Sequence, residues 1–265
     1  METEFLHDVP NVLYKYRDWS NENHKKLLLD RELYFSSIDQ FNDPFDGRVP
    51  YRYNPADLTE EKIFSKLYQL AKQSHTEWTE EQILQDCHEY QRKNLLHDEE
   101  HIEEFQKNTL KSLNELFGIV CLCKEKTNFL LWSHYANSHK GFCIGLNKRL
   151  LFDDTRAAFG HMNYQEELPA IGLFEDAITT ITKLIGTKSK VWEYENEYRL
   201  RKGNHARKII TLRKETIVEV VLGCQMEQND KRQIIEFVSK EYPHAKIFDT
   251  KLSKAKYEIE FMQIK

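Results

Sequence analysis

Two glutamates separated by one residue are the feature of this sequence that most directly indicates chemistry. Glu195 and Glu197 lie in the stretch Lys190-Val-Trp-Glu-Tyr-Glu-Asn-Glu-Tyr-Arg-Leu-Arg201. If this stretch is a strand, residues two apart share one face and lie about 7 Å apart. Such a carboxylate pair suits a reaction with a cationic, oxocarbenium-like transition state. One carboxylate then stabilises the positive charge, while the other orients or deprotonates a nucleophile.

Read as one strand, the same stretch separates an aromatic face from a charged face. The aromatic face would carry Trp192, Tyr194, Asn196, Tyr198 and Leu200, and the charged face Glu193, Glu195, Glu197, Arg199 and Arg201. We expect the aromatic face to pack on a core. Arg199 would then lower the pKa values of the neighbouring glutamates and keep them ionised. The alternative is an exposed surface whose charges form cross-strand ion pairs, and the spacing alone leaves both interpretations open.

A second cluster of polar and aromatic residues lies between Leu130 and His139. It contains Trp132, Ser133, His134, Tyr135, Asn137, Ser138 and His139. On a helix His134 and Tyr135 adjoin one another, so they could grip a ribose or an amide while an aromatic ring stacks on a flat base. The alternative is a capped helix with a core histidine.

Known cofactor and metal signatures are missing from the sequence. The pair Cys121 and Cys123 lacks zinc-knuckle spacing, so we expect no metal site there. The sequence contains no GxGxxG, P-loop, GxSxG or HExxH pattern.

Composition sets the broad class of the protein. The chain has 265 residues with a formal charge of −5 and a pI near 6.1, which argues against a global nucleic-acid footprint. The five cysteines, an odd number, fit reduced thiols in a cytoplasm. The acidic N-terminus lacks the apolar run of a signal peptide, and no stretch is apolar enough for a membrane helix. We therefore expect a cytoplasmic protein that does not contact membranes.

The elements that would position these residues follow from periodicity. Strands are expected at 12–17, 33–37, 119–123, 141–146, 159–164, 208–212, 216–222, 246–249 and 256–264, and helices at 20–30, 129–137, 173–185 and 229–241. Ser20 is the expected N-cap of the first helix. The segment 148–156 fits neither pattern. This mixture predicts an α+β fold with a mixed, largely antiparallel sheet and flanking helices.

The segment 57–117 differs from the rest of the chain. It contains no Gly or Pro between Ala56 and Phe117, and its apolar residues recur at helical spacing. Thr79 and Gln82 match a capping box, and Gly118 stands where a C-terminal cap belongs. We predict three helices, at 59–74, 79–95 and 98–117. They would form a helical insertion, at 57–117, within a single α+β domain of residues 1–265.

Several stretches together resemble a mainly bacterial, uncharacterised family known as domain of unknown function 2971. They are Leu13-Tyr-Lys-Tyr-Arg17, Leu33-Tyr-Phe-Ser-Ser37, Asn42-Asp-Pro-Phe-Asp46, Leu131-Trp-Ser-His-Tyr-Ala136, Lys140-Gly-Phe-Cys-Ile-Gly-Leu146 and Trp192-Glu-Tyr-Glu-Asn-Glu-Tyr-Arg-Leu200. The resemblance spans nearly the whole chain except segment 57–117. It brings no established activity.

The order of strand–Arg, strand–Ser and strand–Glu-x-Glu is also similar, more distantly, to ADP-ribosyltransferases. That similarity implies NAD as a substrate, gripped by Arg17, with Ser36 supporting the site. Glu197 would stabilise the oxocarbenium and Glu195 would orient the acceptor. The remaining NAD-binding residues would be Tyr14, Tyr16, His134, Tyr135 and Arg199.

We therefore expect an NAD-consuming enzyme, either an ADP-ribosyltransferase with a macromolecular acceptor or an NAD glycohydrolase. One alternative is a non-catalytic module that recognises a nucleotide or a protein through residues 132–139. Another is a magnesium-dependent nuclease using carboxylates such as Glu193, Glu195 or Glu197, with Asp43 or Asp46.

Overall fold

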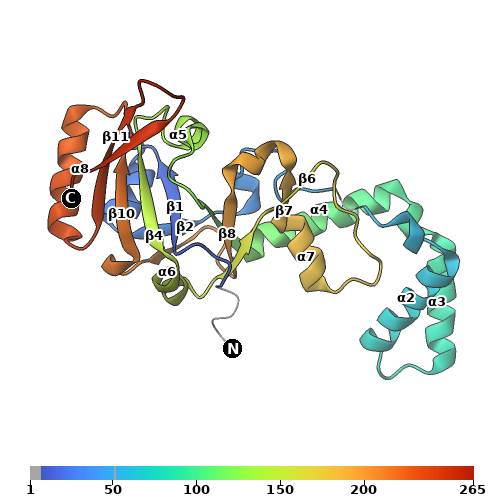
Figure 1. Ribbon diagram of the computed structural model, residues 1–265. Helices are drawn as coiled ribbons and strands as arrows, with labels where there is room; N and C mark the ends of the chain where they lie inside the picture. Colours follow the sequence, from blue (N-terminus) through green and yellow to red (C-terminus); the bar gives the residue numbers. More distant parts are fainter. Residues whose placement is uncertain (1–6, 51) are drawn as a thin grey trace. The chain divides into compact units, whose positions relative to one another are not determined.

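The computed structural model describes residues 7–50 and 52–265, and the chain divides into two compact units (Figure 1). Unit 1 combines residues 1–41, 115–162 and 191–265. Unit 2 combines residues 42–114 and 163–190. The second unit therefore contains more than the expected helical insertion, because segments from both sides of it join the helices.

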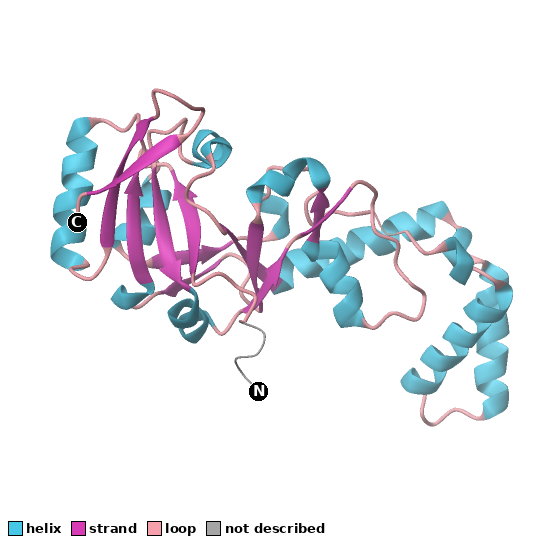
Figure 2. Ribbon diagram, viewed as in Figure 1, coloured by secondary structure: helices cyan, strands magenta, loops and turns pink. Residues whose placement is uncertain are grey.

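Unit 1 is built on an eight-stranded sheet, drawn in magenta in Figure 2. Its strands are, in spatial order, β12 (Ile259–Gln263), β11 (Lys246–Leu252), β10 (Ile217–Leu222), β4 (Phe142–Asn147), β1 (Val12–Arg17), β3 (Phe117–Cys123), β8 (Glu197–Gly203) and β5 (Ala158–His161). Only β10 and β11 pair in parallel; the other neighbours are antiparallel. The predicted α+β class with a largely antiparallel sheet is confirmed.

The sheet is split between its central strands β1 and β3. All six residues of β1 pair with β4, and all seven residues of β3 pair with β8. Between β1 and β3, in contrast, the described residues give one paired position, Tyr14 opposite Cys123. Further along β3 the partner is Ser36, whose amide and carbonyl both bond to Ile119. In the described part of the chain, β1 and β3 therefore have no further pair toward the end of β1.

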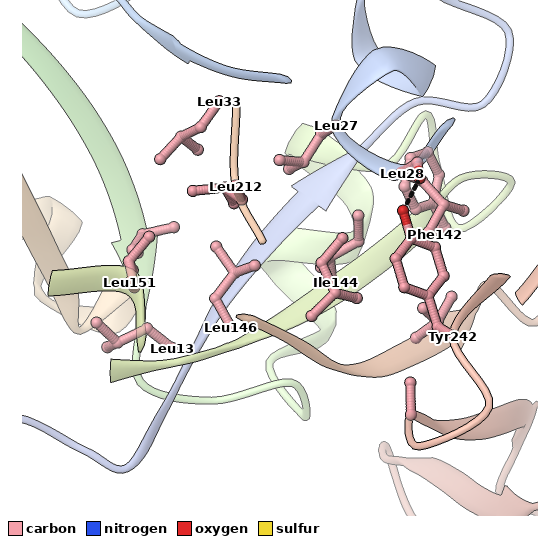
Figure 3. Packing of buried hydrophobic residues seen from close by; sticks show 14 of the residues in the cluster. Leu13, Leu27, Leu28, Leu33, Phe142, Ile144, Leu146, Leu151, Leu212 and Tyr242 are labelled. Carbon is pink, nitrogen blue, oxygen red and sulfur yellow. Dashed lines mark hydrogen bonds between the residues drawn. The ribbon is translucent and has the colours of Figure 1, made fainter. Parts of the chain in front are cut away.

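One face of the sheet is covered by α1 (Glu22–Leu29), α6 (Lys148–Thr155) and α8 (Gln228–Glu241). Their apolar residues pack with the sheet residues Leu13, Ile144 and Leu146 into one large cluster, seen from close by in Figure 3. We call this the aliphatic face. The hydroxyl of Tyr242 lies within it and donates a hydrogen bond to the Leu28 carbonyl at 2.6 Å.

The opposite face carries α5 (Phe129–Tyr135) and a smaller cluster, which we call the aromatic face. It contains Tyr14, Tyr16, Cys123 and Trp132, with the Tyr16 and Trp132 rings edge to face at 5.1 Å. Alternation along β1 thus sends Tyr14 and Tyr16 to this face and Leu13 to the other.

Three helices of unit 2 match the sequence prediction closely. They are α2 (Glu60–Ser74), α3 (Glu80–Lys93) and α4 (Glu99–Leu116), and no strand lies within 60–115. Thr79 caps α3 through the predicted capping box with Gln82. Gly118, the expected C-terminal cap, lies inside β3 instead. A Cβ there would meet the Phe35 Cβ at 2.7 Å and the His205 carbonyl oxygen at 2.3 Å, so close packing explains this glycine.

The rest of unit 2 includes α7 (Ala177–Gly186) and the short parallel strands β6 (Asn163–Gln165) and β7 (Thr187–Ser189). The expected strand 159–164 is therefore wrong as one element, because β5 and β6 belong to different sheets. The expected helix 173–185 begins later, where the Asp176 side chain accepts from the amides of Ile178 and Thr179.

Some boundaries in unit 1 also differ from the sequence prediction. Helix α1 is capped by Asn21 rather than Ser20, because the Asn21 side chain accepts from two amides of the first turn. The segment 148–156, which fitted neither pattern, contains α6, capped by Asn147. A small two-stranded sheet joins β2 (Glu32–Phe35) to β9 (Lys208–Thr211).

Candidate functional site

The stretch Lys190–Arg201 is not one strand. Lys190–Glu195 forms a short 3₁₀ helix (η5), and β8 begins at Glu197. Asn196 between them has a left-handed backbone with φ of 47°. Asparagine tolerates this conformation better than most residues, and it breaks the alternation of side chains. The expected strand geometry for Glu195 and Glu197 is therefore wrong.

Glu197 forms a buried ion pair with Arg199. The Arg199 Nε lies 2.6 Å from Glu197 Oε1, and Nη2 lies 3.3 Å from Oε2. Glu197 is 4% exposed and Arg199 only 1%, so the alternative of an exposed charged surface is wrong for these two residues. The Arg199 guanidinium also lies over the Phe41 ring, 4.9 Å from its centroid. A buried carboxylate held in this way is rigid.

Register places Glu197 on the aromatic face. Glu197 is opposite Cys123, and Cys123 is opposite Tyr14, so the three side chains form one row across three strands. The carboxylate thus lies directly beyond the single pair that joins β1 to β3.

Glu195 is held by a different element. Its Oε1 accepts a hydrogen bond of 2.7 Å from the Tyr135 hydroxyl, at the last residue of α5. Glu195 is 4% exposed. The two glutamates are thus two residues apart along the chain; Glu195 accepts from a phenol, and Glu197 pairs with a guanidinium. Different supports are what two carboxylates with different roles require.

Lys15 occupies the split between β1 and β3. Its Nζ donates to the Cys121 carbonyl at 2.5 Å, on the strand from which β1 has separated. Burial and, next, the charge of Arg17 lower the pKa of Lys15 to about 8. Cys121 and Glu197 act in the opposite direction. The ammonium is therefore an electrostatic neighbour of both Arg17 and Glu197. Lys15 was not expected to belong to the site, because a lysine on a strand usually faces solvent.

Arg17 is the last residue of β1. Its side chain lies on the same face of the strand as Leu13 and Lys15, and not on the face of Tyr14 and Tyr16. Burial lowers its pKa to about 10. Among residues 7–50 and 52–265 its guanidinium makes no ion pair. The same cationic environment acts on His24, whose pKa falls to about 4 through burial and then through the charge of Arg17. The end of β1 is thus a half-buried cationic site.

Tyr14 and Tyr16, expected to stack on a ligand, are buried on the aromatic face. The Tyr14 hydroxyl donates to Glu219 Oε2 at 3.1 Å. The Tyr16 hydroxyl donates to the Glu125 carbonyl at 2.9 Å. Burial raises the pKa of both phenols, so both remain neutral donors. Their contacts give them a structural role beneath α5.

His134 is exposed, so the alternative of a core histidine is wrong; Leu131 and Trp132 are the buried residues of α5. The His134 ring lies 6.2 Å from Tyr135, 6.5 Å from Trp192 and 6.3 Å from Tyr194, centroid to centroid. The sequence reading assigned Trp192 and Tyr194 to a core-packing strand face. The 3₁₀ turn instead brings them to His134.

The structure thus brings the predicted residues together in two groups. Arg17 and Lys15 share one face of β1 with Leu13, and the charge of Glu197 reaches Lys15 from the aromatic face; His134 and Tyr135 lie with Glu195. Arg17 and His134 make no contact with each other among the described residues. Ser36 contributes its backbone to β3, and its side chain is half-buried. Within residues 7–50 and 52–265, no group of three or more His, Cys, Asp or Glu residues could hold a metal ion.

Comparison with known proteins gives one match. A family profile described as "Protein of unknown function (DUF2971)" matches residues 131–200. The match runs from α5 to β8 and contains His134, Tyr135, Glu195 and Glu197. It supports the resemblance to this family, while the similarity to ADP-ribosyltransferases stays a prediction. No curated protein and no solved structure matches the chain.

None of the helices in the described part of the chain has the length and apolar character needed to cross a membrane.

Proposed function

We propose that the protein is an NAD-consuming enzyme that cleaves the glycosidic bond to nicotinamide. The ADP-ribosyl group would pass to water or to a macromolecular acceptor. The observation that carries this proposal is the split beside β1. There, Arg17 ends β1 with Lys15 two residues before it, and the ion-paired Glu197 stands two strands away across β3, on the other face of the sheet, where its charge acts on Lys15.

Arg17 and Lys15 supply the positive charge that a pyrophosphate requires. A half-buried guanidinium without a carboxylate partner has lost hydration, and an anion would restore that interaction. The planar fork of arginine matches phosphate oxygens in two hydrogen bonds. The ammonium of Lys15 adds a point charge on the same face of β1.

Glu197 supplies the negative charge that the reaction requires. When the bond from ribose C1′ to the nicotinamide nitrogen breaks, the electron pair leaves with nicotinamide and C1′ becomes cationic. A fixed carboxylate stabilises that charge without reorganising. The acceptor oxygen then bonds to C1′ and gives up its proton, for which Glu195 is the base. The Tyr135 hydroxyl fixes the orientation of Glu195.

The ring cluster of His134, Trp192 and Tyr194 suits the flat nicotinamide ring. Its members come from α5 and η5, the two elements that also hold Tyr135 and Glu195. A stacked ring there would lie beside the reacting bond.

The direct test is nicotinamide release from NAD by the wild type, Glu197→Gln and Glu195→Gln. Glutamine keeps the size of glutamate and removes its charge. We expect Glu197→Gln to lose about 3–4 kcal/mol of transition-state stabilisation, roughly a 10²–10³-fold slower rate. Glu195→Gln should reduce transfer to an acceptor more than hydrolysis. Glu193→Gln is the matched control, because Glu193 lies in the same stretch and is exposed; its rate should equal that of the wild type.

Thermal melts of each variant separate loss of fold from loss of chemistry. Equal rates for the wild type and Glu197→Gln would remove Glu197 from the mechanism. If Glu195→Gln is the slower variant in simple hydrolysis, the two roles are exchanged. A wild-type protein that releases no nicotinamide contradicts the enzymatic proposal.

A second candidate function, nucleotide recognition without turnover, has an observation of its own. Both glutamates are almost fully buried and already have partners within unit 1. In that case NAD would bind, Arg17→Ala would abolish binding, and no nicotinamide would be released.

A further inference from the structure

The helices of unit 2 leave several large apolar side chains exposed. In α2 the buried residue is Ala71, in α3 Ile83 and Cys87, and in α4 Leu113. Helices of this length gain most of their stability by burying an apolar face. All three helices carry an apolar stripe at helical spacing, and much of it is half-buried, but Leu70, Tyr90 and Phe105 remain exposed.

Several of the exposed side chains line one groove of about 1320 Å³. The groove is lined by residues of α2, of the end of α3, of α4, of the short helix Leu95–His97 and of segment 171–184, all within unit 2. Four of its large apolar side chains, Leu70, Tyr90, Phe105 and Phe174, are 43–46% exposed. Exposed apolar residues that share one hollow mark a binding surface.

The size of the groove indicates a peptide rather than a small molecule. Pockets for drug-sized ligands hold roughly 300–1,000 Å³, and this groove is larger. Amide side chains such as Gln69, Gln73 and Asn94 lie among its apolar residues and can bond to the polar edge of a bound segment.

The negative charge of unit 2 favours a basic peptide. Its two segments carry 19 Asp and Glu against 12 Lys and Arg, a formal charge of −7, whereas the whole chain carries −5. The charged residues of the groove itself are Glu60, Glu175 and Asp176 against Lys66. This field repels nucleic acid and a second copy of the same face, and it attracts a basic segment.

We propose that this groove binds a basic amphipathic helix of a protein partner. Apolar side chains of that helix at i, i+3, i+4 and i+7 would fill the groove, as in other helix-in-groove complexes. Its lysines and arginines would lie toward Glu60 and the acidic N-terminal turns of the helices. The proposal does not depend on the proposed function, because no residue of the split sheet takes part.

The test uses the full chain and two labelled 18-residue peptides with the same leucine stripe. One peptide carries lysine at its polar positions and the other glutamate. Fluorescence anisotropy should show binding of the Leu/Lys peptide, weakened by added salt, and at least about tenfold weaker binding of the Leu/Glu peptide.

Matched variants locate the binding surface. Leu70→Asp places a carboxylate in the groove, whereas Leu84→Asp places one on α3 outside it, at a leucine of similar exposure (44% and 37%). We expect Leu70→Asp to weaken binding about tenfold or more and Leu84→Asp to leave it unchanged. Glu60→Lys should weaken binding of the Leu/Lys peptide more than Glu81→Lys. Both glutamates are exposed in a first helical turn, but Glu60 lines the groove and Glu81 does not.

Circular dichroism and thermal melts confirm that each variant keeps its helices. Equal binding of the two peptides would contradict the proposed preference for a basic helix. Equal effects of Leu70→Asp and Leu84→Asp would mean that the peptide is attracted by charge alone and does not bind in the groove, which overturns the proposal. Sedimentation of the wild type supplies a third result. A dimer that Leu70→Asp dissociates would make a second copy the occupant and overturn the proposal.

Discussion

The two faces of the sheet in unit 1 are built from different kinds of residue. The aliphatic face buries Leu13, Ile144 and Leu146 completely, and its helices add more of the same. The aromatic face buries rings and hydroxyls. On β8 it also buries the charged pair of Glu197 and Arg199.

This difference separates stability from function. Burying aliphatic side chains stabilises a fold directly, whereas burying charges costs free energy unless each charge is well paired. The aliphatic face therefore carries most of the stability of unit 1. The aromatic face gives up stability to hold charged groups beside the part of the sheet where β1 and β3 are not paired.

The largest expected effect lies on the aromatic face. Arg199→Met should destabilise the fold by about 3–5 kcal/mol, because it leaves the carboxylate of Glu197 buried without its guanidinium. Unfolding in urea measures this loss. The double variant Glu197→Leu/Arg199→Met should recover most of the stability, since neither charge remains. A double variant as unstable as the single one would show that the pair is not the cause.

On the aliphatic face, Ile144→Ala should cost about 2–5 kcal/mol through lost burial and the cavity it leaves. Ile144→Val should cost about 0.5–1.5 kcal/mol. Under the proposed function, both variants should release nicotinamide at the wild-type rate at temperatures where they are folded. A rate that falls in proportion to stability would mean that the two faces are not separate in function.

Two tyrosine variants test the same comparison with smaller expected losses of stability. Tyr135→Phe removes a donor to the buried carboxylate of Glu195 and should cost about 1.5–3 kcal/mol, with slower acceptor transfer. Tyr242→Phe removes a neutral bond to the Leu28 carbonyl and should cost about 0.5–1.5 kcal/mol, with no change in rate. Denaturation and nicotinamide release on both variants make the test, and a rate effect in Tyr242→Phe would contradict it.

The last expected effect is a pH dependence at His24. Its folded pKa of about 4 lies below the usual 6.5, so the unfolded chain binds the proton first as the pH falls. The stability from His24 is therefore complete above pH 6.5 and is lost as the pH falls toward 4. Protonation would also break the bond in which His24 Nδ1 accepts from the Asp18 amide. His24→Gln should flatten the stability curve in this window; an unchanged curve would exclude His24 as its origin.

Much of the fold could be predicted from the sequence because local signals were strong. Strand β1 has the predicted ends, and the helices α2 to α4 follow from apolar periodicity and capping residues. The ion pair of Glu197 and Arg199 also follows, since residues two apart on β8 share a face.

The rest of the site depends on features with no local signature. The split between β1 and β3 results from strand pairing across a long segment of sequence, so no motif announces it. The role of Lys15 depends on that split. The stretch before β8 alternated like a strand, and the left-handed Asn196 overrides this pattern. Asparagine was the available clue, because few other residues adopt that conformation readily.

Asn196 also connects η5 to β8, which lie in different parts of unit 1. On a continuous strand the repeat of the backbone would fix the spacing of Glu195 and Glu197. Here the reversal at Asn196 leaves Glu197 anchored in the sheet, while Glu195 is tied by Tyr135 to the end of α5. The position of α5 on the sheet therefore contributes to the separation of the two carboxylates. A shift of that helix would change the distance between them without deforming either element.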